Sequence, residues 1–319
     1  MSLTDFSLHE KLRNGRNWTP APAALVDALT PRRLRAKLEG PELSSSLARI
    51  GSLEARLART SAEVRLAQAL RYRVFYEELG AIPDARAQRM RRDFDRYDRA
   101  CDHVLVIDHD APAPRNAIGL KRPAVVGTYR LLRHEKAQAS GGFYTAGEYD
   151  IGPMLARLPN VRFLELGRSC VLPSHRNRRT LELLWAGVWA YIRHHRCDAM
   201  IGCASFQGTD PQKHALALSF LNHFASATEH WRVAALPHLR VPMGMVPREE
   251  IDEREALRAL PPLIKGYLRL GASVGDGAVV DAQFGTVDVC MILPTAAINP
   301  RYFDKFGAPD APVGMPQAA

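Results

Sequence analysis

Two charged residues stand in an otherwise apolar stretch near the middle of the chain, and their chemistry is that of proton transfer. The mostly apolar residues after Arg162 predict a strand over 162–171, and Glu165 and Arg168 interrupt its interior. A carboxylate on a half-buried strand can take a proton from an ammonium nucleophile, directly or through water. We therefore predict that Glu165 is a general base and that Arg168 holds a substrate carboxylate or a neighbouring acidic residue.

The alternative is a structural salt bridge between Glu165 and Arg168. A regular strand places residues three positions apart on opposite faces of its sheet. A bulge in this strand would bring the two side chains to the same face. Whether Glu165 and Arg168 lie on the same face of the sheet therefore depends on whether this strand contains a bulge.

A short basic loop follows the strand and leads into a helix expected over residues 180–195. The free backbone N–H groups at the start of a helix bind phosphate, and the arginines of the loop would add charge. A base beside such a loop suits acyl transfer from a phosphopantetheine thioester, which would enter between the strands near 165–172 and 199–203. The residues predicted to bind the phosphopantetheine or its carrier protein are Val171, Leu172, Arg176, Asn177, Arg178, Arg179 and Thr180.

An arginine also lies in a second apolar strand, over residues 124–132. A buried arginine needs acidic partners, and Asp95 or Asp98 can supply them to Arg130. One hypothesis is a polar network that lines the acceptor site, and the alternative is an ion network that only anchors loops. The members of the predicted network are Arg71, Asp95, Asp98, Arg130, Glu165 and Arg168.

The elements that must position these residues alternate between strands and helices. A capping box at residues 60–63 begins a helix that ends near Gly80. The strand–helix–strand order over residues 162–203 implies a right-handed parallel crossover. Together the elements predict an α/β fold with a mixed sheet flanked by helices. The further strands are expected over residues 103–108, 199–203, 265–270 and 286–293, and a further helix from about residue 211.

The two ends of the chain differ from this pattern. Residues 1–43 are rich in proline, alanine and arginine, whereas 44–59 show the spacing of a basic amphipathic helix. That helix would either pack on the domain or rest on a membrane surface. We therefore expect an N-terminal appendage over 1–59, an acyltransferase domain over 60–306 and a tail over 307–319.

Composition limits the classes of function. The formal charge of +9 favours an acidic partner or an anionic surface over a neutral one. Five cysteines without trusted zinc spacing, and an N-terminus without a signal-peptide core, fit a reducing cytoplasm and no metal site. The chain carries no zinc-finger, RNA-recognition or basic-zipper motif, so nucleic acid is not an expected partner.

Several motifs carry a resemblance to known families. The order of elements resembles the GCN5-related N-acetyltransferase (GNAT) fold, and residues 71–80, 95–98, 127–132 and 164–168 resemble the conserved segments of acyl-homoserine-lactone synthases. The resemblance to ornithine–acyl carrier protein N-acyltransferases is closer and spans about residues 60–306. The segments that carry this second resemblance are 167–171, 179–185 and 263–272, with Asp281, Phe284, Gly285 and Asp288.

This resemblance implies transfer of a 3-hydroxyacyl group from acyl carrier protein to the α-amine of L-ornithine, which gives lyso-ornithine lipid. It implies no permanently bound cofactor, with the phosphopantetheine of the carrier protein as acyl donor, and a cytoplasmic enzyme with peripheral inner-membrane contact through residues 32–59. Asn177 replaces a glycine that is usual in the pyrophosphate loop of the fold, but asparagine tolerates the same left-handed backbone. The alternatives are an acyl-homoserine-lactone synthase, the same reaction with glycine or another amino acid, and a non-catalytic binding protein.

Overall fold

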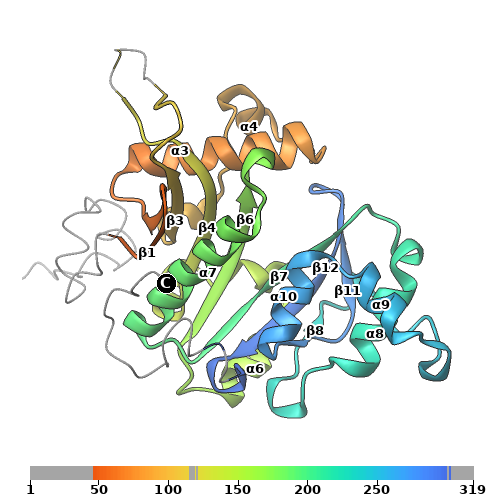
Figure 1. Ribbon diagram of the computed structural model, residues 1–319. Helices are drawn as coiled ribbons and strands as arrows, with labels where there is room; N and C mark the ends of the chain where they lie inside the picture. Colours follow the sequence, from red (N-terminus) through yellow and green to blue (C-terminus); the bar gives the residue numbers. More distant parts are fainter. Residues whose placement is uncertain (1–45, 115–118, 120, 300–301, 303–319) are drawn as a thin grey trace, which may run out of the picture.

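A ten-stranded mixed sheet forms the centre of the molecule (Figure 1). The computed structural model describes residues 46–114, 119, 121–299 and 302. The strand order is β1-β2-β3-β4-β6-β7-β12-β11-β9, with β10 paired to β12. The strands of the left half are β1 (Ala48–Ile50), β2 (Leu53–Leu57), β3 (Asp102–Asp108), β4 (Val125–Arg133) and β6 (Phe163–Val171). Those of the right half are β7 (Ala199–Gln207), β9 (Arg240–Val241), β10 (Ser273–Val274), β11 (Ala278–Asp281) and β12 (Thr286–Pro294).

Helices cover both faces of this sheet, and a small second sheet pairs β5 (Tyr149–Asp150) with β8 (Ala234–Ala235). The helices are α3 (Ser61–Tyr72), α4 (Ala85–Met90), α5 (His134–Ala139), α6 (Gly152–Arg157), α7 (Arg178–His195), α8 (Ala215–Phe224), α9 (Glu253–Ala259) and α10 (Pro262–Leu270). A π-helical turn (Arg73–Glu78) prolongs α3, and short 3-10 turns include Arg96–Arg99 and Tyr144–Gly147. The mixed α/β architecture predicted from the sequence is confirmed.

Alternation along β3 shows how the two layers form. Val104 and Val106 are fully buried in the large cluster that includes the apolar face of α7. Leu105 and Ile107 point the other way and pack with Val64 of α3. A strand with both faces covered has apolar residues at successive positions, which is why this segment is recognisable as an apolar run.

The only parallel pair among the described strands is β6 with β7, joined through α7 as the crossover predicts. Its register covers Phe163↔Ala199, Leu164↔Met200 and Glu165↔Ile201. Beyond these pairs the two strands diverge, as Figure 1 shows. The divergence lies in the region where the sequence predicts entry of the thioester.

From residue 46 onward the segment 44–59 forms a hairpin, so the prediction of an amphipathic helix there is wrong. Its described part forms β1 and β2, joined by a turn in which Gly51 has φ 59°. Strand β2 pairs with β3 along its whole length, so the sheet begins before residue 60. Alternate side chains such as Leu53 and Ala55 are buried under α7, and this burial decides between a strand and a helix. The membrane contact predicted over 32–59 therefore cannot be made by an amphipathic helix at 46–59. Residues 1–45 and 307–319 lie outside the described chain.

The strand expected over residues 265–270 is also wrong. Residues 262–270 form α10, which begins after Pro261 and ends at Gly271 in the left-handed conformation (φ 105°). Ile264, Tyr267 and Leu270 are buried at a spacing of three residues, which is a helical rather than a strand period. The strand expected over 286–293 is confirmed as β12.

Candidate active site

A β-bulge in β6 brings Glu165 and Arg168 to one cavity. The register of β6 against β4 shifts between Thr128 and Arg130, and Arg168 has φ 52° in the left-handed region. Such a bulge turns a side chain from one face of the sheet to the other. The bulge considered in the sequence analysis is thus present.

The cavity has a volume of about 260 Å³ and lies where β6 and β7 separate. Its walls come from both halves of the sheet, from the segment after β4 and from the end of the π-helical turn. The lining includes Phe75, Leu79, Tyr129, Arg130, Tyr144, Thr145, Glu165, Arg168, Ser169, Cys203, Ser205, Asp281, Phe284, Thr286 and Asp288.

Gly202 lets the two strands approach closely at the start of the divergence. A Cβ atom built on Gly202 would lie 2.3 Å from the carbonyl oxygen of Leu166. No carbon atom can occupy that position without moving a strand. Glycine at 202 is therefore a requirement of the geometry that opens the cavity.

Buried ion pairs connect most of the predicted acceptor-site network. Arg71 donates to both carboxylate oxygens of Asp98, at 3.0 and 2.8 Å. Arg130 donates to Asp95 at 2.7 Å and to Asp98 at 3.3 Å. Arg168 lies 3.6 Å from Asp95. Five of the six predicted members thus meet. Of these five, Arg130 and Arg168 line the cavity, whereas the structure does not place Arg71, Asp95 and Asp98 in its lining.

Asp93 is a member that the sequence analysis missed. Its Oδ2 atom lies 2.7 Å from Nε of Arg71 and 3.4 Å from Nε of Arg168, and the residue is buried. It precedes Asp95 by two positions in a loop with no helical or strand period. Only the demand of three arginines for acidic partners could have pointed to it.

Asp98 is the centre of this network. Burial alone would favour its neutral form, but the guanidinium groups of Arg71 and then Arg130 hold the pKa of Asp98 well below its ordinary value. Asp98 also accepts hydrogen bonds from Gln68 and from the backbone of Asp95. The resulting ionised cluster fixes the helix α3, the 3-10 turn and strand β4 relative to one another.

Glu165 lies beside this network rather than within it. Its carboxylate accepts hydrogen bonds from the backbone N–H groups of Tyr144 (2.9 Å) and Thr145 (2.6 Å), at the start of a 3-10 turn. The charge partners of Arg168 are aspartates, so the proposed salt bridge with Glu165 is replaced by these contacts. A carboxylate offers about four acceptor positions, so Glu165 can hold the turn and still accept a substrate proton.

Arg168 is clamped between two aromatic rings. Its guanidinium carbon lies 4.7 Å from the ring centre of Tyr144 and 4.5 Å from that of Phe284. Both distances are those of cation–π contacts. The clamp holds the guanidinium at the cavity wall, where it can meet a carboxylate.

In the loop before α7, several of the residues predicted to bind the acyl donor make contacts with other groups of the protein. Asn177 has an extended backbone (φ −129°) rather than the left-handed one that asparagine tolerates, and it caps α7 by accepting from the backbone N–H of Thr180 at 3.1 Å. Arg176 pairs with Glu78 and donates to the carbonyl of Val171 at 2.9 Å. The remaining members differ in exposure: Leu172 is half-buried, Thr180 is buried, Arg178 pairs with Glu182 on the surface, and Arg179 is exposed.

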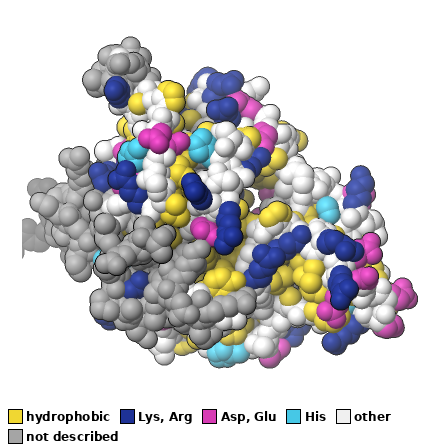
Figure 2. Space-filling model, viewed as in Figure 1, with side chains coloured by type: hydrophobic (Ala, Val, Ile, Leu, Met, Phe, Trp, Pro, Cys, Tyr) yellow, Lys and Arg dark blue, Asp and Glu magenta, His cyan; other side chains and the backbone are white. Residues whose placement is uncertain are grey.

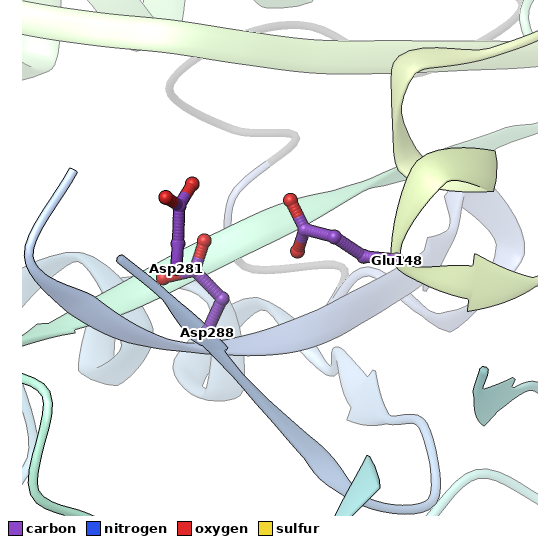
Figure 3. Close-up of side chains that lie close together, drawn as sticks. All are labelled: Glu148, Asp281 and Asp288. Carbon is purple, nitrogen blue, oxygen red and sulfur yellow. The ribbon is translucent and has the colours of Figure 1, made fainter. Parts of the chain in front are cut away.

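A second polar group, of which Asp281 and Asp288 line the cavity, has no counterpart among the predicted site residues. The carboxylates of Glu148, Asp281 and Asp288 point toward one another from three separate segments (Figure 3). In the sequence analysis, Asp281 and Asp288 only extend a resemblance, and Glu148 is not named. No local spacing relates Glu148 to the other two, so the sequence carries no signal that Glu148 joins Asp281 and Asp288.

The fold and the bulged strand beside the cavity define an acyltransferase of the GNAT class. Residues 70–186 match the family model described as the acetyltransferase (GNAT) domain. The chain is 54% identical over 259 residues to the L-ornithine N(alpha)-acyltransferase of Agrobacterium fabrum, which covers 81% of this chain and 86% of that protein. It is 52% identical over 262 residues to the protein of the same name from Brucella abortus, with 82% and 91% covered. The chain belongs to the family of L-ornithine N(alpha)-acyltransferases.

The solved structures that are similar to this one include an N-acyl amino acid synthase, FeeM, from uncultured soil microbes. That comparison gives a TM-score of 0.43 at 12% identity and covers 79% of this chain and 97% of that structure.

Proposed function

We propose that this enzyme transfers a 3-hydroxyacyl group from the phosphopantetheine of acyl carrier protein to the α-amine of L-ornithine, with lyso-ornithine lipid as product. The names of its relatives support ornithine as acceptor. The observation that carries the proposal is the cavity between β6 and β7, in which Glu165 and Arg168 lie together. A thioester laid along the diverging strands would present its carbonyl carbon to an amine held in that cavity.

The chemistry needs one proton acceptor and one carbonyl-polarising group. The α-ammonium gives a proton to the carboxylate of Glu165, directly or through water, and the free amine attacks the thioester carbon. Backbone N–H groups of β6 beyond Glu165 polarise the carbonyl oxygen as charge develops on it. The C–N bond forms, the C–S bond breaks, and the pantetheine sulfur leaves and takes up the second proton that the nitrogen loses as the amide forms. Arg168 holds the carboxylate of the amino acid through this sequence.

Surface charge favours an acidic carrier protein as the donor. Lys and Arg side chains form a band across the face seen in Figure 2, next to hydrophobic side chains. On α4 and the residues after it, Arg89, Arg91 and Arg92 are exposed or half-buried, and Ile82 nearby is 66% exposed. A carrier protein with acidic helices would meet such a surface through steering and a small apolar contact. The basic loop at residues 176–179 would then hold the single phosphodiester of the phosphopantetheine.

A peripheral contact with the inner leaflet of the membrane follows from the amphiphilic product. Among the helices of the described residues, none is both long enough and apolar enough to span a bilayer. A cytoplasmic enzyme that releases a single-chain lipid would gain from a basic surface that touches anionic lipid. Co-sedimentation with vesicles of anionic and neutral composition tests this contact, and equal binding to both would contradict it.

The first experiment incubates the purified enzyme with 3-hydroxyacyl carrier protein and a panel of amino acids, and weighs the lipid-extractable product. A mass equal to 3-hydroxyacyl-ornithine supports the proposal. A product with glycine or another amino acid would contradict ornithine as the acceptor but would still support N-acylation as the reaction. Lactone formation from S-adenosylmethionine would overturn both. Equal activity with acyl-coenzyme A would contradict the assignment of acyl carrier protein as the acyl donor.

A further inference from the structure

We propose that Glu148, Asp281 and Asp288 form the subsite that receives the side-chain ammonium group of the acceptor amino acid. The inference rests on the proposed function and adds to it the means by which a diamino acid is recognised. One carboxylate oxygen of each residue lies within 4.8 Å of the others. Figure 3 shows all three carboxylates directed into a common space.

The fold brings these acids together from three separate segments. Asp281 ends β11, and Asp288 lies on the neighbouring β12, two positions along from the residue that faces Asp281 in the register. Such diagonal neighbours share one face of a sheet, where like charges repel. Glu148 enters from the segment just before β5. A cation in the shared space would turn this repulsion into attraction.

Two unpartnered oxygen atoms point to a missing ligand. Asp288 is 6% exposed and Glu148 is 9% exposed, so both side chains are more than nine-tenths buried. Oδ1 of Asp288 and Oε2 of Glu148 have no hydrogen-bond partner among the described residues. A buried carboxylate oxygen without a donor is costly, and native proteins rarely keep one without a use.

The position of the cluster selects the ligand. Asp281 and Asp288 line the same cavity as Glu165 and Arg168. An amino acid bound by its carboxylate at Arg168 and by its α-amine at Glu165 extends its side chain into the rest of that cavity. In ornithine this side chain has three methylene groups and spans about 5 Å before it ends in an ammonium. An ammonium has three N–H donors, which matches three carboxylate acceptors.

The test compares ornithine with norvaline, which keeps the three-carbon side chain and lacks the ammonium. In the wild-type enzyme, kcat/KM for ornithine should exceed that for norvaline by about 100-fold, because norvaline cannot make the two or three charge-assisted hydrogen bonds of the ammonium group. Asp288→Asn should raise KM for ornithine about 10- to 100-fold with little change in kcat, and should leave norvaline unaffected. Lysine and 2,4-diaminobutyrate, whose ammonium groups lie farther out and nearer, should both be poorer substrates than ornithine.

Asp281→Asn is a second variant that preserves the local fold. The backbone N–H of Phe284 donates to Oδ1 of Asp281 at 2.9 Å, and an asparagine oxygen can accept the same bond. Glu249→Gln is the matched control, because Glu249 is exposed on another segment. This control substitution should leave kcat/KM unchanged for both ornithine and norvaline.

Three results would overturn the subsite. They are a parallel loss for ornithine and norvaline in both variants, a wild-type enzyme that does not distinguish the two substrates, and activity that is lost on chelation and restored by Mg²⁺, which would make the cluster a metal site. A wild-type enzyme that acylates no amino acid would instead refute the proposed function, so the two failures are distinguishable.

Discussion

Replacing Glu148 by glutamine should stabilise the ligand-free enzyme at pH 8 and leave its stability near pH 4 unchanged. Burial, followed by the charge of Asp288, raises the pKa of Glu148 to about 7 from its ordinary 4.5. Asp281 acts in the same direction, whereas Cys203 and Arg168 oppose it. The folded protein therefore holds this carboxylate against its electrostatic preference at neutral pH.

The magnitude follows from the shift in pKa between the unfolded and folded states. Each pKa unit corresponds to about 1.4 kcal/mol, so a rise from 4.5 to about 7 gives about 3 kcal/mol. Below pH 4.5 the carboxyl is protonated in both states and costs nothing. Between pH 4.5 and 7 the unfolded chain releases the proton while the folded chain keeps it, so the free energy of unfolding falls with rising pH. The full penalty applies above pH 7.

Urea unfolding of the wild type and Glu148→Gln at pH 4.5, 6 and 8 measures this difference. The gap between the two free energies of unfolding should open from near zero to about 3 kcal/mol as pH rises. The exposed substitution Glu249→Gln controls for loss of one negative charge. Saturating ornithine should stabilise the wild type at pH 8 more than the variant. Two curves that stay parallel across the pH range would refute the reasoning.

Three further substitutions test the geometry of the site. Glu165→Gln should lower kcat about 100-fold or more in the product assay and lower the free energy of unfolding by about 1–3 kcal/mol, because one backbone N–H near Tyr144 loses its acceptor; unchanged kcat would remove Glu165 as base. Asp98→Asn should cost about 3–5 kcal/mol in urea unfolding, because it leaves Arg71 charged and poorly paired in the interior; a loss below 1 kcal/mol would contradict a central role for this carboxylate. Gly202→Ala should destabilise the fold by about 1–3 kcal/mol and reduce kcat/KM, because the added Cβ displaces the carbonyl of Leu166; wild-type values for both would show that the strands have room.

The sequence predicts the central strands well because they are buried on both faces. The runs at 103–108, 124–132 and 162–171 correspond to β3, β4 and β6 within a residue or two. At the edges of the sheet, burial on one side leaves a weaker pattern, and the apolar spacing of 44–59 fits a helix as well as a hairpin. Tertiary pairing with β3 decides that segment.

In the site too, some residues can be recognised from their own segment, whereas others matter only because of the tertiary structure. Charged residues inside apolar strands, such as Glu165 and Arg130, are conspicuous in the sequence because each needs an explanation within its own segment. Asp93 and Glu148 lie in loops, where an acidic residue is ordinary. Their importance comes from burial beside partners that only the folded chain supplies.

The distribution of charge suggests how one chain can bind two partners of opposite charge. Within the buried network, Arg71, Arg130 and Arg168 are matched by Asp93, Asp95 and Asp98, so this network contributes almost no net charge to the cavity. The acidic residues that line the cavity outside this network are Glu165, Asp281 and Asp288, whereas the whole chain carries a formal charge of +9. This distribution of charge is consistent with the proposal of an acidic donor protein at the exterior and a cationic acceptor in the interior. Arg168 is clamped between two aromatic rings where the neutral network meets the acidic residues of the cavity, and the proposed function places the substrate carboxylate at this position.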